Sequence, residues 1–377
     1  MAWVDALKAG ACCLIVLHHL AFYGPMADQA SALWPGMFEW LAQHARLAVQ
    51  VFLVLGGYLA ARSLLPALRN HGARSEHSGS RGLGDSFNHP RSPGAHHVSP
   101  WANAVERIAQ RFIRLALPLW MALVAAVVCN AWADHWMDHP SIGAPPQGDQ
   151  VLWHLLLLQD IAGHEALSAG VWYVAIDFQL YALLTLMAAA AQGTRQARTT
   201  LSVFCLLLLA VSAGWFNRQA HLDEFAPYFW TAYGLGVLLG LQAGPRTWVA
   251  AAVIVGVAVW WDPRLRLMVA AGTALVIGMA LALQGRMPLS VAPWVQGLSR
   301  ISYSVFLIHF PISLVVNAAW TAFLPPSPLV QFLGVITAFK LSLLAGWIFH
   351  HAVERPLVEA ATALWRRPRS QVPSGSA

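Results

Sequence analysis

Apolar runs about as long as a bilayer is thick recur along this chain of 377 residues, and they restrict its fold more than any other feature. A hydrocarbon core of roughly 30 Å needs about 20 apolar residues to cross it as a helix. With 58% hydrophobic and 11% charged residues, the sequence predicts an all-α polytopic membrane protein of about ten transmembrane helices. The predicted spans are 5–23, 46–66, 112–131, 171–191, 199–216, 228–244, 247–261, 267–284, 301–320 and 329–351.

Basic residues divide unevenly between the two sides of the membrane. If the N-terminus is inside, only four of the 23 lysines and arginines fall in outer segments, and these are Arg46, Arg218, Arg264 and Arg266. Lys340 lies within a span, so the other 18 fall on the inner side. Because cytoplasmic loops carry an excess of lysine and arginine, this predicts an N-in, C-in topology. The same bias explains the net charge of +6, and no nucleic-acid partner is expected.

Residues 69–100 form the one long stretch without an apolar run, and they are rich in Ser, Gly, His, Arg and Pro. This composition predicts a disordered cytoplasmic loop within a transmembrane domain of residues 1–365. Residues 366–377 predict a disordered basic cytoplasmic tail. The histidines of the loop lack the spacing of metal ligands, so no metal site is expected.

Two shorter features predict packing rather than chemistry. Residues 151–159 are apolar but too short to span, which predicts an interfacial or re-entrant helix on the outer face. Gly234, Gly236 and Gly240 lie inside a predicted span, not between a strand and a helix as in a nucleotide-binding loop. They favour close packing of helices through small residues.

The first span carries ionisable side chains at membrane depth, where such groups are costly and indicate a functional site. Lys8 lies near one end, and His18 and His19 lie further in. At about 100° per residue, His19 falls within roughly 20° of the face of Lys8, about 16 Å along the axis, whereas His18 points about 80° away. We therefore expect His19 to be the functional histidine. A histidine satisfied by a neighbouring helix is the alternative.

A basic stripe leads into the third span. Arg107, Arg111 and Arg114 are spaced i, i+4 and i+7, so they share one helix face. Arginine forks suit phosphate oxygens, and the stripe lies on the predicted cytoplasmic side. Anchoring of the topology, or contact with anionic lipid, is the alternative explanation.

Two later spans also contain polar residues. Asp177 and Tyr181 are spaced i, i+4 and so lie on one face of the fourth span. A carboxylate inside a span requires a partner, and a histidine is a suitable one. In the ninth span His309 lies just before Pro311, a residue that distorts helices. Because unpartnered polar groups are expensive in lipid, we expect these side chains to meet inside the helix bundle.

Taken in order, these residues resemble the acyltransferase-3 family of membrane acyltransferases, which O-acylate cell-surface glycans. The resemblance covers nearly the whole chain and rests on the segments 5–19, 49–58, 111–118, 172–181, 302–311 and 353–356. The first of them resembles the family's basic residue followed by a catalytic histidine. Three residue departures are visible, because Lys8 stands where arginine is usual, Gly56 stands where serine is usual, and Asp177-Phe178 stands where a glutamate pair is common.

The resemblance implies transfer of an acyl group, acetyl being expected, from cytoplasmic acyl-CoA to a hydroxyl of a cell-surface or lipid-linked glycan. It implies a bacterial inner membrane protein in which His19 is the general base and Asp177 orients it. A covalent acyl-histidine step is left open. The residues expected to bind acyl-CoA or substrate are Lys8, Arg107, Arg111, Arg114, Trp172, Gln179, Tyr181, Ser302, Tyr303 and His309.

No permanently bound cofactor is expected, and the implied partners are acyl-CoA, the glycan acceptor and membrane lipids. A transporter or flippase of a lipid-linked saccharide is the alternative function, because buried His and Asp residues and Lys340 suit a proton relay. The sequence shows neither a repeated half nor a pair of broken helices, which such transporters often have. A membrane scaffold would leave the buried polar residues without a purpose. The sequence carries no signal for an oligomeric state.

Overall fold

A computed structural model describes residues 1–79, 99–284 and 290–365 of the chain, with the backbone alone for 69–79. In these described ranges the chain consists of helices and the turns between them, without a strand. Eight of the helices are long and apolar enough to cross a membrane. The prediction of an all-α polytopic membrane protein is therefore confirmed.

The helices have the following bounds. They are α1 Ala2–Phe22, α2 Pro25–Ala30, α3 Pro35–His44, η1 Ala45–Leu47, α4 Ala48–Gly79, α5 Pro100–Asp134, α6 Gly148–Leu155, α7 Val171–Ala191, α8 Ala197–Gly214, η2 Phe216–Arg218, η3 Ala220–Leu222, α9 Ala226–Gly240, α10 Pro245–Trp261, α11 Leu265–Leu283, α12 Pro293–Phe323, α13 Pro328–Phe349, η4 His350–Glu354 and α14 Arg355–Trp365.

Each predicted span falls on a helix, but two of these helices are short. The predicted spans 228–244 and 247–261 coincide with α9 and α10, which have 15 and 17 residues. A helix of 15 residues rises about 22 Å, which is less than a hydrocarbon core of about 30 Å. Almost every residue of α9 is buried among other helices. The count of ten crossings and the N-in, C-in topology stay predictions.

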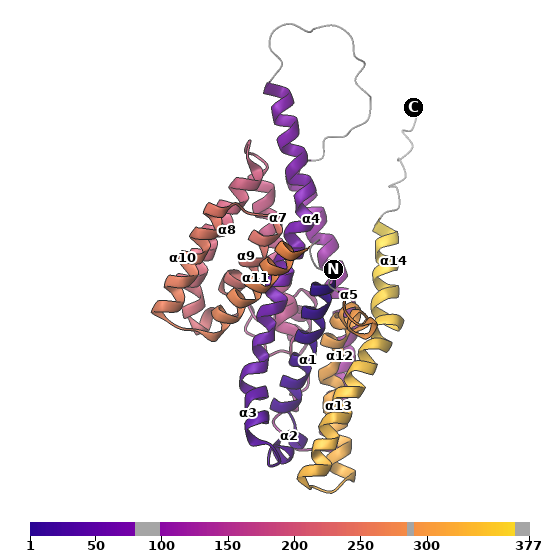
Figure 1. Cartoon of the computed structure of the whole chain (residues 1–377). Helices are drawn as coiled ribbons and strands as arrows, with labels where there is room; N and C mark the ends of the chain where they lie inside the picture. The colour runs from indigo at the N-terminus through magenta and orange to yellow at the C-terminus, as the bar shows by residue number, and fades with distance from the viewer. Residues whose placement is uncertain (80–98, 285–289, 366–377) are drawn as a thin grey trace, which may run out of the picture.

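The segment predicted as a loop over 69–100 begins later than expected. Helix α4 continues through residues 69–79 to Gly79, and Figure 1 shows its end projecting beyond the other helices. Residues 80–98 of the predicted loop and the predicted tail 366–377 lie outside the described residues. The short helix predicted at 151–159 is present as α6, displaced by a few residues.

Helix α12 lies in the interior of the bundle and packs against α1, α5 and α13. Figure 1 shows α8 and α10 on one side of α12, and α13 and α14 on the other. Helices α4 and α9 also form an extensive contact. A Cβ atom on Gly57 would overlap the carbonyl oxygen of Tyr233, and one on Gly236 would overlap that of Val54. The predicted packing role of the glycines in α9 is therefore confirmed for Gly236, because only glycine allows the two backbones to touch.

Candidate functional site

The first candidate site is a pair of histidines that joins α1 to α12. His19 Nδ1 lies 2.6 Å from Nε2 of His309, and the two ring planes are nearly parallel, at 11°. Both side chains are buried, His309 completely. The sequence singled out both histidines separately, and the structure brings them together.

The other contacts of His309 determine where the protons of the pair lie. Its Nδ1 lies 2.9 Å from the carbonyl oxygen of Phe306 and 3.1 Å from that of Val305. A carbonyl oxygen can only accept, so Nδ1 carries the proton, and Nε2 of the neutral ring accepts. His19 must then donate through Nδ1–H, which leaves the lone pair of its Nε2 unprotonated. In this network His309 selects the tautomer of His19 that can act as a base.

The neighbouring His18 has a different environment. Its Nδ1 donates toward the carbonyl oxygen of Leu41 in α3, at 3.1 Å. The ring centroids of His18 and His19 are only 5.0 Å apart, but the two rings have different hydrogen-bond partners, and His19 is the one that bonds to α12. Of the two histidines, His19 is therefore the one that contacts another predicted site residue.

A pocket of about 610 Å³ opens beside these residues, and we call it the histidine pocket. Its lining includes His18, His19, Trp172, Phe306 and Phe310. Trp172 was predicted as a site residue, and it is held by an aromatic contact with Phe229, 5.6 Å between ring centroids. The histidine pocket is large enough for a small ligand to reach His19.

A second pocket of about 500 Å³ contains the predicted basic stripe, and we call it the arginine pocket. Arg107, Arg111 and Arg114 line it together with Tyr181 of α7 and Trp365 of α14. The helix spacing therefore placed the three arginines correctly on one face. Lys8 does not line this pocket among the described residues.

Asp177 has a partner other than the predicted one. Its carboxylate accepts a hydrogen bond from the guanidinium of Arg111 and forms an ion pair with it. The Asp177 side chain is only 8% exposed, so this is a largely buried ion pair. The guanidinium also lies over the ring of Tyr181, 5.2 Å from its centroid. The expectation that Asp177 orients His19 is therefore wrong in this structure, because Asp177 binds Arg111 and His309 takes the orienting position.

The two pockets lie close together along the helices that they share. Ile176 of α7 lines the histidine pocket, and Tyr181 of the same helix lines the arginine pocket. Five residues of helix rise about 7.5 Å. On α4, Gln50 and Gly56 line the two pockets and are about 9 Å apart by the same rise. Asp177 follows Ile176, so the ion pair with Arg111 lies between the pockets.

Three further predicted residues make structural contacts outside both pockets. The Tyr303 hydroxyl donates to the carbonyl oxygen of Leu115 at 2.7 Å and so joins α12 to α5. Gln179 Oε1 accepts from the backbone N–H of Ala226 at 3.3 Å, at the start of α9. Ser302 donates to the carbonyl oxygen of Ser299 at 2.9 Å within its own helix. In the described structure these three side chains form hydrogen bonds with the backbone of helices.

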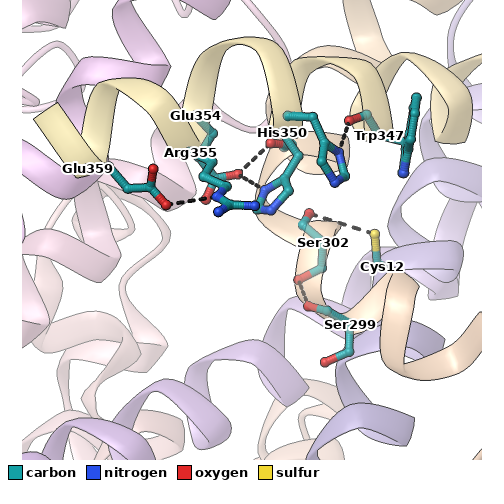
Figure 2. A network of polar contacts seen from close by, with 10 residues as sticks. Cys12, Ser299, Ser302, Trp347, His350, Glu354, Arg355 and Glu359 are labelled. Atoms are coloured by element: carbon teal, nitrogen blue, oxygen red, sulfur yellow. Dashed lines mark hydrogen bonds and ion pairs between the residues drawn. The ribbon is translucent and has the colours of Figure 1, made fainter. Parts of the chain in front are cut away.

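Figure 2 shows a polar network around Glu354, which lies in segment 353–356 of the family resemblance but was not predicted as a site residue. Glu354 accepts a hydrogen bond from the Ser304 hydroxyl of α12 and lies 2.9 Å from Nδ1 of His350. It closes the π-helical turn η4, and turns of this kind are frequent at functional sites. The i, i+4 spacing of His350 and Glu354 was the available signal. In the same view Cys12 of α1 approaches the carbonyl oxygen of Ser302 at 3.8 Å.

Comparison with known proteins gives one result. A family model described as an acyltransferase domain, Acyl_transf_3, matches residues 1–350. Neither the curated proteins nor the solved structures returned a match. The matched range contains both histidines, all three arginines of the stripe and Asp177.

Proposed function

Because this chain belongs to the acyltransferase-3 family and is an integral membrane acyltransferase, we propose that it moves an acyl group from acyl-CoA to a glycan hydroxyl, with His19 as the general base. Acetyl is the expected acyl group, and a cell-surface or lipid-linked glycan is the expected acceptor. The observation that supports this most is the hydrogen bond between His19 and His309. It leaves an unprotonated Nε2 on His19, beside a pocket of about 610 Å³.

The arginine pocket is the proposed site for the phosphates of acyl-CoA. Arg114 is exposed and makes no hydrogen bond or ion pair with the described residues, and Arg107 donates only a long bond of 3.4 Å to the carbonyl oxygen of Ser63. Free guanidinium groups bind phosphate through two parallel hydrogen bonds. This pocket lies on the side where the sequence places the cytoplasm, which contains acyl-CoA. Arg111 contributes less directly, since Asp177 already binds it.

The short separation of the two pockets supports transfer through the membrane domain. About 7.5–9 Å of helix separates residues that line the arginine pocket from residues that line the histidine pocket. The flexible arm of a coenzyme bound at the arginines would extend over this distance beside the Arg111–Asp177 ion pair. The thioester would then reach His19 from one side, and the acceptor hydroxyl would reach it through the histidine pocket.

The proposed step is general base catalysis. His19 Nε2 takes the proton of the acceptor hydroxyl while the oxygen forms a bond to the thioester carbonyl carbon. The carbon–sulfur bond breaks, and the thiolate of CoA receives the proton from the His19 imidazolium. His309 keeps Nδ1–H of His19 bonded and is therefore a positioning residue. An acyl group carried briefly on His19 is a variant with the same products.

Turnover of acetyl-CoA by the purified protein tests this proposal against the transporter. We expect release of free CoA thiol that increases with acceptor and is lost in His19→Ala. We expect Arg114→Ala to raise the KM for acetyl-CoA by about 10-fold or more, the effect of one charge-assisted hydrogen bond. Arg246→Ala is the matched control, because Arg246 is exposed on the same predicted side and lies outside the arginine pocket. No turnover by the folded wild-type protein would overturn the proposal.

The transporter alternative has less support in the structure. It used Lys340 as part of a buried proton relay, but the Lys340 side chain is exposed on α13. Mass spectrometry of surface glycans with and without the gene separates the two functions. Loss of acyl groups from an otherwise unchanged glycan supports the acyltransferase, whereas loss of the glycan itself supports the transporter.

A further inference from the structure

One part of the lining of the histidine pocket is acidic, and the proposed base catalysis does not use it. Asp160 follows α6, and Asp223 and Glu224 lie between η3 and α9. Burial raises the pKa of Asp160, and the negative charges of Glu224 and Asp223 add to this shift. The chain therefore brings two separate connecting segments together to place carboxylates at one pocket.

Asp160 is the most enclosed member of this group. It is partly buried, and its Oδ2 accepts a hydrogen bond of 2.7 Å from Gln159 Nε2. Burial raises the pKa of Asp160 to about 6, although the bond from Gln159 acts in the opposite direction. None of the ion pairs among the described residues involves Asp160. The carboxylate thus has acceptor capacity left for a ligand in the histidine pocket.

A buried hydroxyl points independently to a polar ligand in the same pocket. Ser168 lines the histidine pocket and is only 5% exposed. Its hydroxyl oxygen has no hydrogen-bond partner in the described structure. An unsatisfied buried hydroxyl is unfavourable, so a ligand that offers hydrogen-bonding groups at this position would be stabilised. Apolar surface from Trp172 and Phe306 completes a lining suited to the hydroxyls and the apolar faces of a sugar ring.

The histidine pocket also has two arginines in its lining, but they do not cancel the negative charge near Asp160. Arg266 donates to the Tyr228 hydroxyl and lies over the same ring, 5.1 Å from the centroid. Arg46 is exposed, and its charge acts on His18 rather than on Asp160. Near Asp160 the dominant charges are therefore negative.

We propose that Asp160, with Asp223 and Glu224 beside it, binds hydroxyl groups of the acceptor and makes the histidine pocket select an uncharged saccharide over one that carries a carboxylate or phosphate. This inference rests on the proposed function, because it names the acceptor site of that reaction. Hydroxyl groups donate to carboxylates in charge-assisted bonds, whereas an anionic sugar would face like charges. Asp160 is then an acceptor-binding residue, and His19 remains the base.

Binding of two disaccharides to the wild-type protein in nanodiscs tests the inference directly. The probes are cellobiose and cellobiouronic acid, which differ by one carboxylate, and binding is measured by saturation-transfer NMR. We expect cellobiose to bind at least 10-fold more tightly, and Asp160→Asn to weaken it about 10-fold or more, as for one hydrogen bond to a charged group. Asp138→Asn is the matched control, an exposed carboxylate that does not line the pocket.

The pH dependence gives a second readout that a purely structural role would not produce. Cellobiose affinity should fall as the pH drops through about 6, when Asp160 is protonated, and Asp160→Asn should remove this change. The other charged or titratable groups that face the pocket are Asp223, Glu224, Arg46, Arg266, His18, His19 and Tyr23. Protonation of His19 would lower kcat for acyl transfer, whereas protonation of Asp160 would lower the affinity for cellobiose. The turnover and binding measurements therefore distinguish the two events.

The outcomes separate this inference from the proposed function. Unchanged cellobiose binding in Asp160→Asn, tighter binding of cellobiouronic acid, or binding of neither probe would overturn the acceptor-site assignment. Those results would leave acyl-CoA turnover and its dependence on His19 intact. Absence of turnover in the wild type would instead remove the proposed function on which the inference rests.

Discussion

Replacement of His309 by alanine tests the central feature of the site, because it leaves His19 in place and removes its hydrogen-bond partner. In the native protein His19 Nδ1 lies 2.6 Å from His309 Nε2. Without that acceptor the buried Nδ1–H is unsatisfied, or the proton moves to Nε2 of His19. An unsatisfied Nδ1–H raises the free energy of the His19 orientation that the reaction needs. Protonation of Nε2 removes the lone pair that accepts the proton of the acceptor hydroxyl.

The size of the effect follows from the burial of the pair. Leaving one buried donor unsatisfied costs about 1–3 kcal/mol. If this cost adds in full to the activation free energy of acyl transfer, kcat falls by roughly 5- to 150-fold. His19→Ala removes the base itself and should reduce the rate by about 10²–10⁴-fold. His18→Ala should be much milder, because His18 bonds to the carbonyl oxygen of Leu41 and is not part of the pair.

The assay is steady-state release of CoA thiol by purified variants, with acetyl-CoA binding measured separately to show that each protein is folded. His309→Gln is the informative companion, since its amide oxygen can accept from Nδ1–H of His19 and should restore part of kcat. A wild-type kcat in folded His309→Ala would refute the tautomer argument. An inactive His18→Ala beside an active His19→Ala would overturn the assignment of the catalytic histidine.

Three other predictions concern the framework around the site. Arg111→Ala and Asp177→Ala should each destabilise the protein by about 3–5 kcal/mol, because each leaves an unpaired buried charge, and the double variant should lose less stability than the sum of the two. Thermal unfolding in detergent measures these losses. Strictly additive losses would argue against coupling between the two residues. Gly236→Ala should greatly reduce the yield of folded protein because its Cβ would overlap α4, whereas Gly256→Ala on α10 meets nothing within 4 Å and should be tolerated. Reporter fusions after residues 140 and 262 should indicate the outer side, and a cytoplasmic signal at either point would contradict the N-in topology.

The sequence by itself determined features that depend on one helix at a time. The length of each apolar run predicted where helices form, because the bilayer requires a minimum span. Helix periodicity placed Arg107, Arg111 and Arg114 on one face and separated His18 from His19, since both follow from about 100° per residue. Order along the chain also carried the family resemblance, which the match to residues 1–350 confirms.

Only the tertiary structure decided which of these polar residues meet. His19, Asp177 and His309 each needed a partner in lipid, and the sequence suggested Asp177 for His19. The structure instead joins His19 to His309 and Asp177 to Arg111. Such pairings depend on the rotation and separation of different helices, and these are set by packing contacts such as that of Gly236 against α4. The acidic residues near Asp160 come from connecting segments without periodicity, so no pattern in the sequence predicts their common pocket.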